Sequence, residues 1–102
     1  MLFDLNPSPT FVATVNITVA GEPSRPLQVR YRRKDTEEYR AFVHKQQGDR
    51  EMVSEIVESV IDKDPASTDA QFLERLLAKF PTAAMDIYIT FCREMGESRA
   101  KN

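Results

Sequence analysis

The chain has 102 residues, which is enough for one domain with a hydrophobic core but leaves little material for a deep substrate pocket. Its 14 basic and 16 acidic residues give a net charge of −2, and this balance argues against a nucleic-acid-binding protein, which usually carries a basic excess. A single cysteine (Cys92), a single histidine and the lack of any apolar run of about 18 residues speak against an intramolecular disulfide, a structural zinc site and a membrane-spanning helix.

Residues 1–10 are expected to form an extended arm, because Pro7 and Pro9 each remove a backbone donor and disfavour a helix. Four side chains of this arm are large and apolar: Met1, Leu2, Phe3 and Leu5. Two interpretations are open. The arm covers the surface of its own domain, or it docks on a neighbouring subunit or another partner.

Residues 11–19 alternate in side-chain direction, which predicts a β-strand with one buried face and one wet face. Residues 27–32 predict a second strand, and the turn-rich loop between them predicts a β-hairpin. We expect Pro26, at the start of the second strand, to occupy an edge position. A lone hairpin is marginal in water, so its apolar face must rest on the helices or pair with another chain.

Two helices are predicted after the hairpin. Asp35 and Glu38 form a capping box that starts a short helix, and Gly48 is its expected end. Asp49 can start a second helix that ends near residue 64, because apolar residues recur in pairs every four positions with glutamates between them. The many β-branched side chains in this stretch also suit a strand, but their spacing favours a helix.

The last two predicted helices organise the fold. Thr68 and Gln71 form a capping box, and an apolar stripe follows as far as Phe80. Pro81 then interrupts the pattern, and a second amphipathic helix starts at Ala83. We expect these two helices to fold back on each other.

The predicted fold class is therefore α+β, with an N-terminal β-hairpin followed by about four α-helices, the last two an antiparallel helical pair. Residues 11–97 are expected to form a single domain, preceded by the arm. Residues 98–102 are polar and are expected to form a frayed tail.

The final helix is apolar on more than one side, a pattern typical of a helix that is deeply buried or shared with a partner. Core packing and docking, including self-association, both stay open at this point. The residues predicted to contact a partner are Phe80, Met85, Tyr88, Ile89, Phe91 and Cys92. Considered by itself, Cys92 is interpreted as a small buried hydrophobic side chain.

A basic cluster is formed by Arg30, Arg32, Arg33 and Lys34. A solvated strand face is the favoured interpretation, ahead of an acidic protein partner. Nucleic acid is disfavoured because no aromatic residue shares this face to stack on bases. The sequence also lacks the Cys/His, Ser/His/Asp and glycine-rich patterns of active sites. We therefore predict no enzyme, no catalytic, metal-binding or cofactor-binding residue, no cofactor and no small-molecule substrate.

Four stretches together carry a resemblance to a known family: DLNPSPTFVATVNI, the Gly-Pro turn followed by LQVRYRRKDTEEY, FLERLLAKFPTAAMDIYITFCREM, and the ending ESRAKN. In the order of these stretches the chain resembles the phage tail assembly chaperones of long-tailed bacteriophages and prophages. The resemblance covers nearly the whole chain.

The resemblance implies a non-catalytic chaperone that binds the tape-measure protein, assists tail-tube assembly and works in the cytoplasm of the bacterial host. Its partners are then the tape-measure protein and the tail-tube protein, with a homo-oligomer expected and no membrane or nucleic-acid partner. The family also implies a longer form made by programmed frameshift, and an A-rich run coding for residues 100–102 is a hypothesis for its site. The alternative is a small structural tail-completion or connector protein whose hairpin joins a ring by strand addition.

Overall fold

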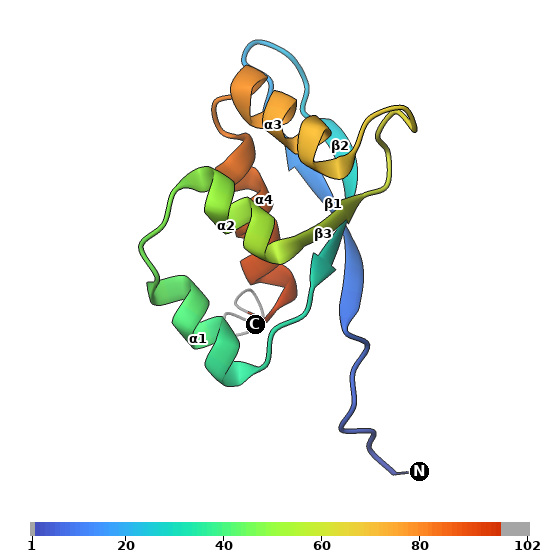
Figure 1. The fold of residues 1–102 in the computed structure, drawn as a ribbon, viewed down its shortest axis with the longest axis vertical. Helices are drawn as coiled ribbons and strands as arrows, with labels where there is room; N and C mark the ends of the chain where they lie inside the picture. Colours follow the sequence, from blue (N-terminus) through green and yellow to red (C-terminus); the bar gives the residue numbers. More distant parts are fainter. Residues whose placement is uncertain (1, 97–102) are drawn as a thin grey trace.

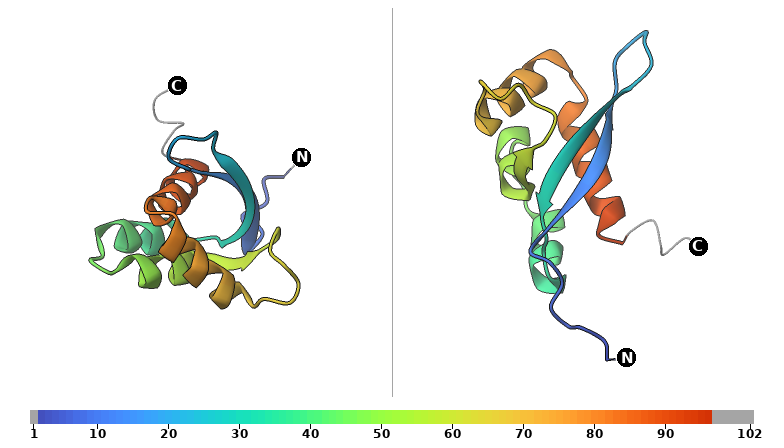
Figure 2. Two further views of the ribbon diagram at one scale, coloured as in Figure 1. Left: turned by 90° about the horizontal axis from the view of Figure 1, so that it is seen from above. Right: turned by 90° about the vertical axis from the view of Figure 1, so that its right-hand side faces the viewer.

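In the residues that the structure describes, the fold is a three-stranded antiparallel sheet, in the order β1-β2-β3, with four helices on its concave side (Figures 1 and 2). It comes from a computed structural model, which describes residues 2–96. The α+β class, the N-terminal hairpin and the four helices predicted from the sequence are confirmed. The predicted tail at residues 98–102 lies outside the described residues.

The predicted hairpin is formed by strands β1 (Thr10–Ile17) and β2 (Arg25–Arg32), which pair along their whole length. Apolar side chains alternate toward the helices as the sequence indicates, and Val15 and Val29 are completely buried. The hairpin therefore supplies one wall of the core, and its apolar face rests on the helices of the same chain.

Pro26 was expected at an edge, but β2 is the central strand of the sheet, so this expectation is wrong for the strand as a whole. The proline is tolerated because its register partner on β1 is Asn16, while β3 pairs with β2 only further along, from Val29 onward. The position of Pro26 thus lies beyond the reach of β3, and no ladder hydrogen bond is lost there.

The predicted second helix is wrong in its second half. Helix α2 (Asp49–Ile56) stops early, and the chain continues directly as strand β3 (Val57–Val60), which pairs antiparallel with β2. The register slips once along this pairing, so that Glu58 is an extra residue in β3. This bulge breaks the regular alternation of a strand. The apolar residues of β3 are therefore spaced as they would be on one face of a helix, although they form a strand.

Two side chains fix this change from helix to strand. The Arg32 guanidinium donates to the carbonyl oxygens of Ser54 and Val57, each at 2.8 Å, and so places a cation at the C-terminal end of α2. The Asp69 carboxylate accepts a hydrogen bond of 2.8 Å from the backbone N–H of Val60. Both groups come from other parts of the chain, so the local sequence pattern could not predict these contacts.

Helix α1 (Thr36–His44) begins at the predicted capping box, in which the Glu38 backbone N–H donates to the Asp35 carboxylate at 2.8 Å. Its predicted end is wrong. The helix stops at the extended residue Lys45, and Gly48 is instead the N-cap of α2. No left-handed glycine is needed where an extended residue already ends the helix.

Helices α3 (Asp69–Lys79) and α4 (Ala83–Glu94) are separated at Pro81, as predicted. The capping box before α3 is also confirmed, with the Gln71 backbone N–H donating to the Thr68 hydroxyl at 3.1 Å. The two helices contact each other, but α4 packs most extensively on β1 and α2. In Figure 1, α3 lies at one end of the sheet and α4 runs along it.

An aromatic cluster forms the centre of the core. Phe91 of α4 is completely buried, and its ring lies 5.4 Å from the rings of both Tyr31 and Phe42. Phe11 stacks on Tyr31 at 5.4 Å. The Tyr31 hydroxyl donates to the carbonyl oxygen of Ile87 at 2.9 Å, which satisfies this polar group inside the core and joins β2 to α4.

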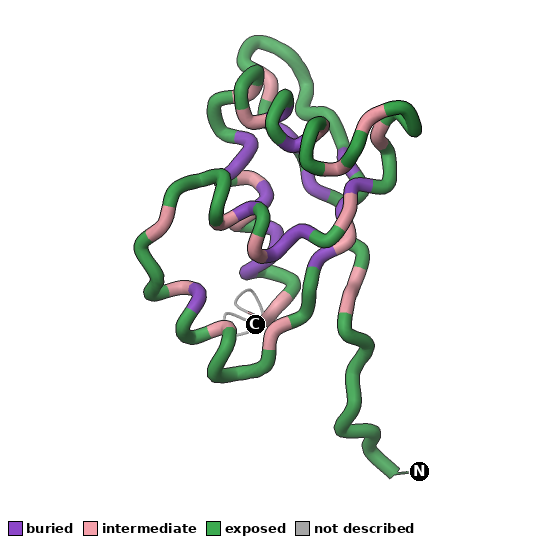
Figure 3. Tube along the Cα trace, in the orientation of Figure 1, coloured by how far each residue is buried: buried purple, intermediate pink, exposed green. Residues whose placement is uncertain are grey.

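Residues 2–9 form no helix or strand and extend away from the domain (Figures 1 and 3). Arg33 anchors the base of this arm, because its backbone N–H donates to the Pro9 carbonyl at 2.8 Å and its Nε to the Ser8 carbonyl at 2.6 Å. The apolar side chains of the arm are exposed, so in this structure the arm does not cover its own domain.

Candidate partner-binding site

Two of the six predicted partner contacts belong to the core. Phe91 is completely buried at the centre of the aromatic cluster, and the neighbouring Cys92 is buried as well. Contact with a partner at either side chain requires the domain to open. The structure therefore assigns both residues to folding stability, and a polar residue at either position is expected to unfold the domain.

Met85 and Ile89 are the exposed members of the set, at 55% and 47%. They lie one turn apart on α4 and so share one face of the helix. This face is held firmly at its start, because the Asp86 carboxylate accepts hydrogen bonds from the Thr18 backbone N–H at 2.9 Å and from the Thr82 hydroxyl at 3.2 Å. The result is a pair of large apolar side chains on a well-anchored helix.

Tyr88 and Phe80 are half-buried. The Tyr88 ring packs 5.7 Å from the ring of Phe42 on α1. Phe80 ends α3, and the Arg25 guanidinium lies 5.8 Å from the centre of its ring. The two side chains thus present part of an aromatic ring each, at separate places on the domain.

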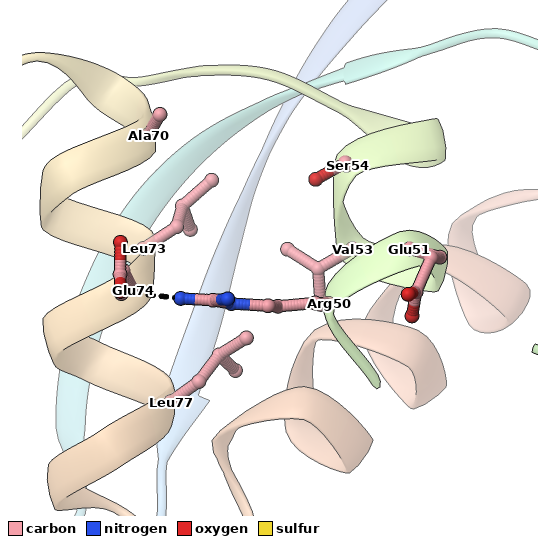
Figure 4. A pocket seen from close by; sticks show the side chains of 8 residues that line it. All are labelled: Arg50, Glu51, Val53, Ser54, Ala70, Leu73, Glu74 and Leu77. Atoms are coloured by element: carbon pink, nitrogen blue, oxygen red, sulfur yellow. Dashed lines mark ion pairs between the residues drawn. The ribbon is translucent and has the colours of Figure 1, made fainter. Parts of the chain in front are cut away.

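A cleft of about 390 Å³ opens between α2 and α3. Figure 4 shows Arg50 reaching across it to form an ion pair with Glu74, while Val53, Leu73 and Leu77 are directed into the space between the helices. An apolar floor crossed by one exposed ion pair has the character of a binding surface. The apolar stripe predicted to end at Phe80 did not reveal this cleft, because helical spacing alone does not show that Leu73 and Leu77 are directed toward α2.

Three of the four cations in the predicted basic cluster contact other groups of the domain. Arg32 caps α2, and the Arg33 guanidinium lies 5.2 Å from the centre of the Phe11 ring. The Lys34 ammonium lies 3.0 Å from the Glu55 carboxylate. The favoured interpretation, a solvated strand face, is therefore incomplete, because these three cations hold the ends of α2 and of the arm in place.

Glu55 is held as a carboxylate by its surroundings. Burial raises the pKa of its carboxyl group, but hydrogen bonds from Lys34, Lys45 and Gln47 outweigh burial and bring the pKa below its ordinary value. Tyr31 behaves differently, since burial raises the pKa of its phenol, and the neutral hydroxyl is the form that donates to Ile87. Both shifts have structural causes.

The side chains described by the structure include no group of three or more His, Cys, Asp and Glu residues that could bind a metal ion. Among the helices of residues 2–96, none combines the length and the apolar character needed to cross a bilayer. The exposed α4 pair and the cleft between α2 and α3 are thus surface features that can contact another protein.

Comparison with known proteins identifies the family. No curated protein and no solved structure shows a significant match to the chain. The family of proteins described as phage tail assembly chaperones, however, matches residues 1–102, which is the complete sequence. The resemblance seen in the sequence motifs is thereby confirmed, and the chain belongs to the phage tail assembly chaperone family.

Proposed function

We propose that this protein is a non-catalytic chaperone that binds a phage tape-measure protein and keeps it soluble while the tail tube assembles around it. The observation that carries the proposal is the family match over residues 1–102. A tape-measure protein is a long, helical and aggregation-prone chain, and such a chain exposes apolar surface until its final partners cover it. The tail-tube protein is the proposed second partner.

The outer face of α4 is the proposed contact surface for the tape-measure protein. Met85, Tyr88 and Ile89 follow the i, i+3, i+4 spacing that places side chains together on one helix face. The exposure of Met85 and Ile89 supports the proposal, because an amphipathic helix of the partner can bury them. Phe80 offers a further half-buried ring at the end of α3.

We further propose that the protein acts as a homo-oligomer in the cytoplasm of the bacterial host. A longer, frameshifted form is part of the same proposal. The nucleotides that encode residues 100–102 test it directly. An Ala100 codon that ends in a base other than A, or an AAG codon for Lys101, removes the A-rich run that a slipping ribosome needs.

Co-expression with the long helical open reading frame next to the gene tests the function. The proposal predicts that this product moves from the insoluble to the soluble fraction when the chaperone is present, and that the two proteins copurify. An unchanged soluble fraction contradicts the proposal. Presence of the protein in purified virions favours the alternative, a structural tail-completion or connector protein, because an assembly chaperone leaves before the virion is complete.

A further inference from the structure

The arm at residues 2–9 carries apolar surface that its own domain leaves uncovered. Leu2 is 95% exposed, Phe3 is 88% exposed and Leu5 is 81% exposed, although side chains of this size usually find cover. Asp4 is the one charged residue of the arm and lies among these three. The arm is therefore a short extended peptide that combines large apolar side chains with a single negative charge.

An apolar groove of about 290 Å³ lies on α3, and we call it the α3 groove. It is lined by Phe72, Leu76 and Phe80, which follow each other at one-turn intervals. Arg75 and Lys79, both exposed, lie along the same groove. Two half-buried aromatic rings and two exposed cations give this surface the chemistry to receive an apolar, acidic peptide.

The charges around the α3 groove favour an acidic ligand. Arg75 and Lys79 line it together with one acidic residue, Asp64. Arg25 lies 5.8 Å from the centre of the last aromatic ring in the groove, but its charge is offset by the Glu22 carboxylate, 3.2 Å away. The excess is positive, so the negative charge of Asp4 in the arm is complementary to it.

We infer that the arm of one copy of this chain docks in the α3 groove of a second copy. Phe3 and Leu5, which an extended peptide directs to the same side, fill the apolar floor of the groove, and Asp4, between them on the other side, faces the cations on its rim. Pro7 and Pro9 hold the base of the arm extended, so little conformational freedom is lost on docking.

The placement of the two surfaces favours an exchange between copies. The arm leaves the domain at one end of its longest axis and points away from α3, which lies at the other end (Figures 1 and 2). A contact between two different patches repeats from copy to copy and forms a ring where the rotation closes, or a filament where it does not. This inference rests on the self-association proposed above and not on the outer face of α4, although the groove includes Phe80, which is also proposed as a contact for the tape-measure protein.

Two variants test the arm and the α3 groove separately. F3D places a charge in the arm, and R75E/K79E reverses the charge of the groove. All three side chains are exposed, so both proteins are expected to keep the thermal stability of the wild type. Sedimentation velocity should show assemblies of the wild type and the 11.7 kDa monomer for each variant alone.

Mixing the two variants gives the sharpest result. F3D retains an intact groove and R75E/K79E retains an intact arm, so an equimolar mixture should form a dimer of twice the monomer mass and nothing larger. R40E is the control, because it reverses one exposed positive charge on α1, outside the groove, and should assemble like the wild type. Adding D4K to R75E/K79E should restore assembly, because the facing charges are then opposite again.

A wild-type chain that stays monomeric, or an F3D variant that assembles like the wild type, overturns the inference. Failure of the mixed variants to form a dimer also overturns it. Each of these results is compatible with full solubilisation of the tape-measure protein. Conversely, a protein that assembles through its arm but leaves the tape-measure protein insoluble overturns only the proposed function.

Discussion

Arg32 lies at the point where α2 ends and β3 begins, and its guanidinium donates to the carbonyl oxygens of Ser54, Glu55 and Val57. Ser54 and Glu55 lie in the last turn of α2, whose carbonyl groups have no partner within the helix, and a positive charge beside them also offsets the helix dipole. One side chain of the central strand thus ends a helix and positions the strand that pairs with it. Arg32 therefore has a structural role although its side chain is exposed.

The R32M variant tests this role. Methionine keeps most of the aliphatic stem but has no donor, so the free energy of unfolding should fall by about 2 kcal/mol, which is typical of hydrogen bonds to a charged group. Urea denaturation followed by circular dichroism measures the change. R30M, two residues away on the same strand, is the control and should cost about 0.5 kcal/mol or less. Equal losses in the two variants would show that Arg32 has no special role.

The lowered pKa of Glu55 predicts that the stability of the domain depends on pH. Its folded pKa lies below the ordinary 4.5, which is also the value expected in the unfolded chain. Its contribution to stability is therefore complete above pH 4.5 and is lost as the pH falls through the lower folded pKa. E55Q should be less stable than the wild type near neutral pH by about 1 kcal/mol or less, and the difference should shrink in acid. A difference that is constant from neutral to acidic pH contradicts this explanation.

At the scale of elements, the sequence predicted those helix starts that depend only on contacts between residues close together in the chain. The capping boxes at Asp35 and Thr68 need only residues three positions apart, and both helices begin where these boxes place them. β3 could not be predicted in this way, because its partner is β2, and the contacts from Arg32 and Asp69 that fix its limits come from distant positions. Tertiary contacts thus override a helical apolar spacing.

Asp69 offers a direct test of how β3 is held. Its carboxylate accepts the hydrogen bond from the Val60 N–H and lies in the first turn of α3. D69A should lower the free energy of unfolding by about 1 to 2 kcal/mol and should speed hydrogen exchange at the Val60 amide. D64A, which removes a carboxylate bonded only within its own turn, is the control. Unchanged exchange at Val60 in D69A would contradict the assignment.

At the scale of the whole molecule, the chain buries its own core but leaves several large apolar side chains exposed on its surface. The interior is closed around Phe91, whereas Met85 and Ile89 on α4 and the apolar residues of the arm stay exposed. Helical spacing alone could identify two apolar arcs on the last helix. It could not tell which arc faces β1 and α2, so it placed Phe91 and Cys92 among the partner contacts. The sequence thus predicted the helix that carries the exposed pair, but only the packing separates surface from core.

The outer face of α4 is the surface on which the proposed function depends. M85D/I89D puts two charges on this face without altering the core, so the variant should fold like the wild type. I61D is the control for a charge placed elsewhere on the surface, because Ile61 is 47% exposed, the same as Ile89, but lies beyond the end of β3. Circular dichroism and thermal melts should show that both variants keep the wild-type fold.

The most direct test of the account is the soluble fraction of the tape-measure protein when it is co-expressed with each of these chains. The account predicts that the wild type and I61D keep it soluble, whereas M85D/I89D leaves it in the insoluble fraction as if no chaperone were present. A folded M85D/I89D variant that solubilises the tape-measure protein as well as the wild type would contradict the account.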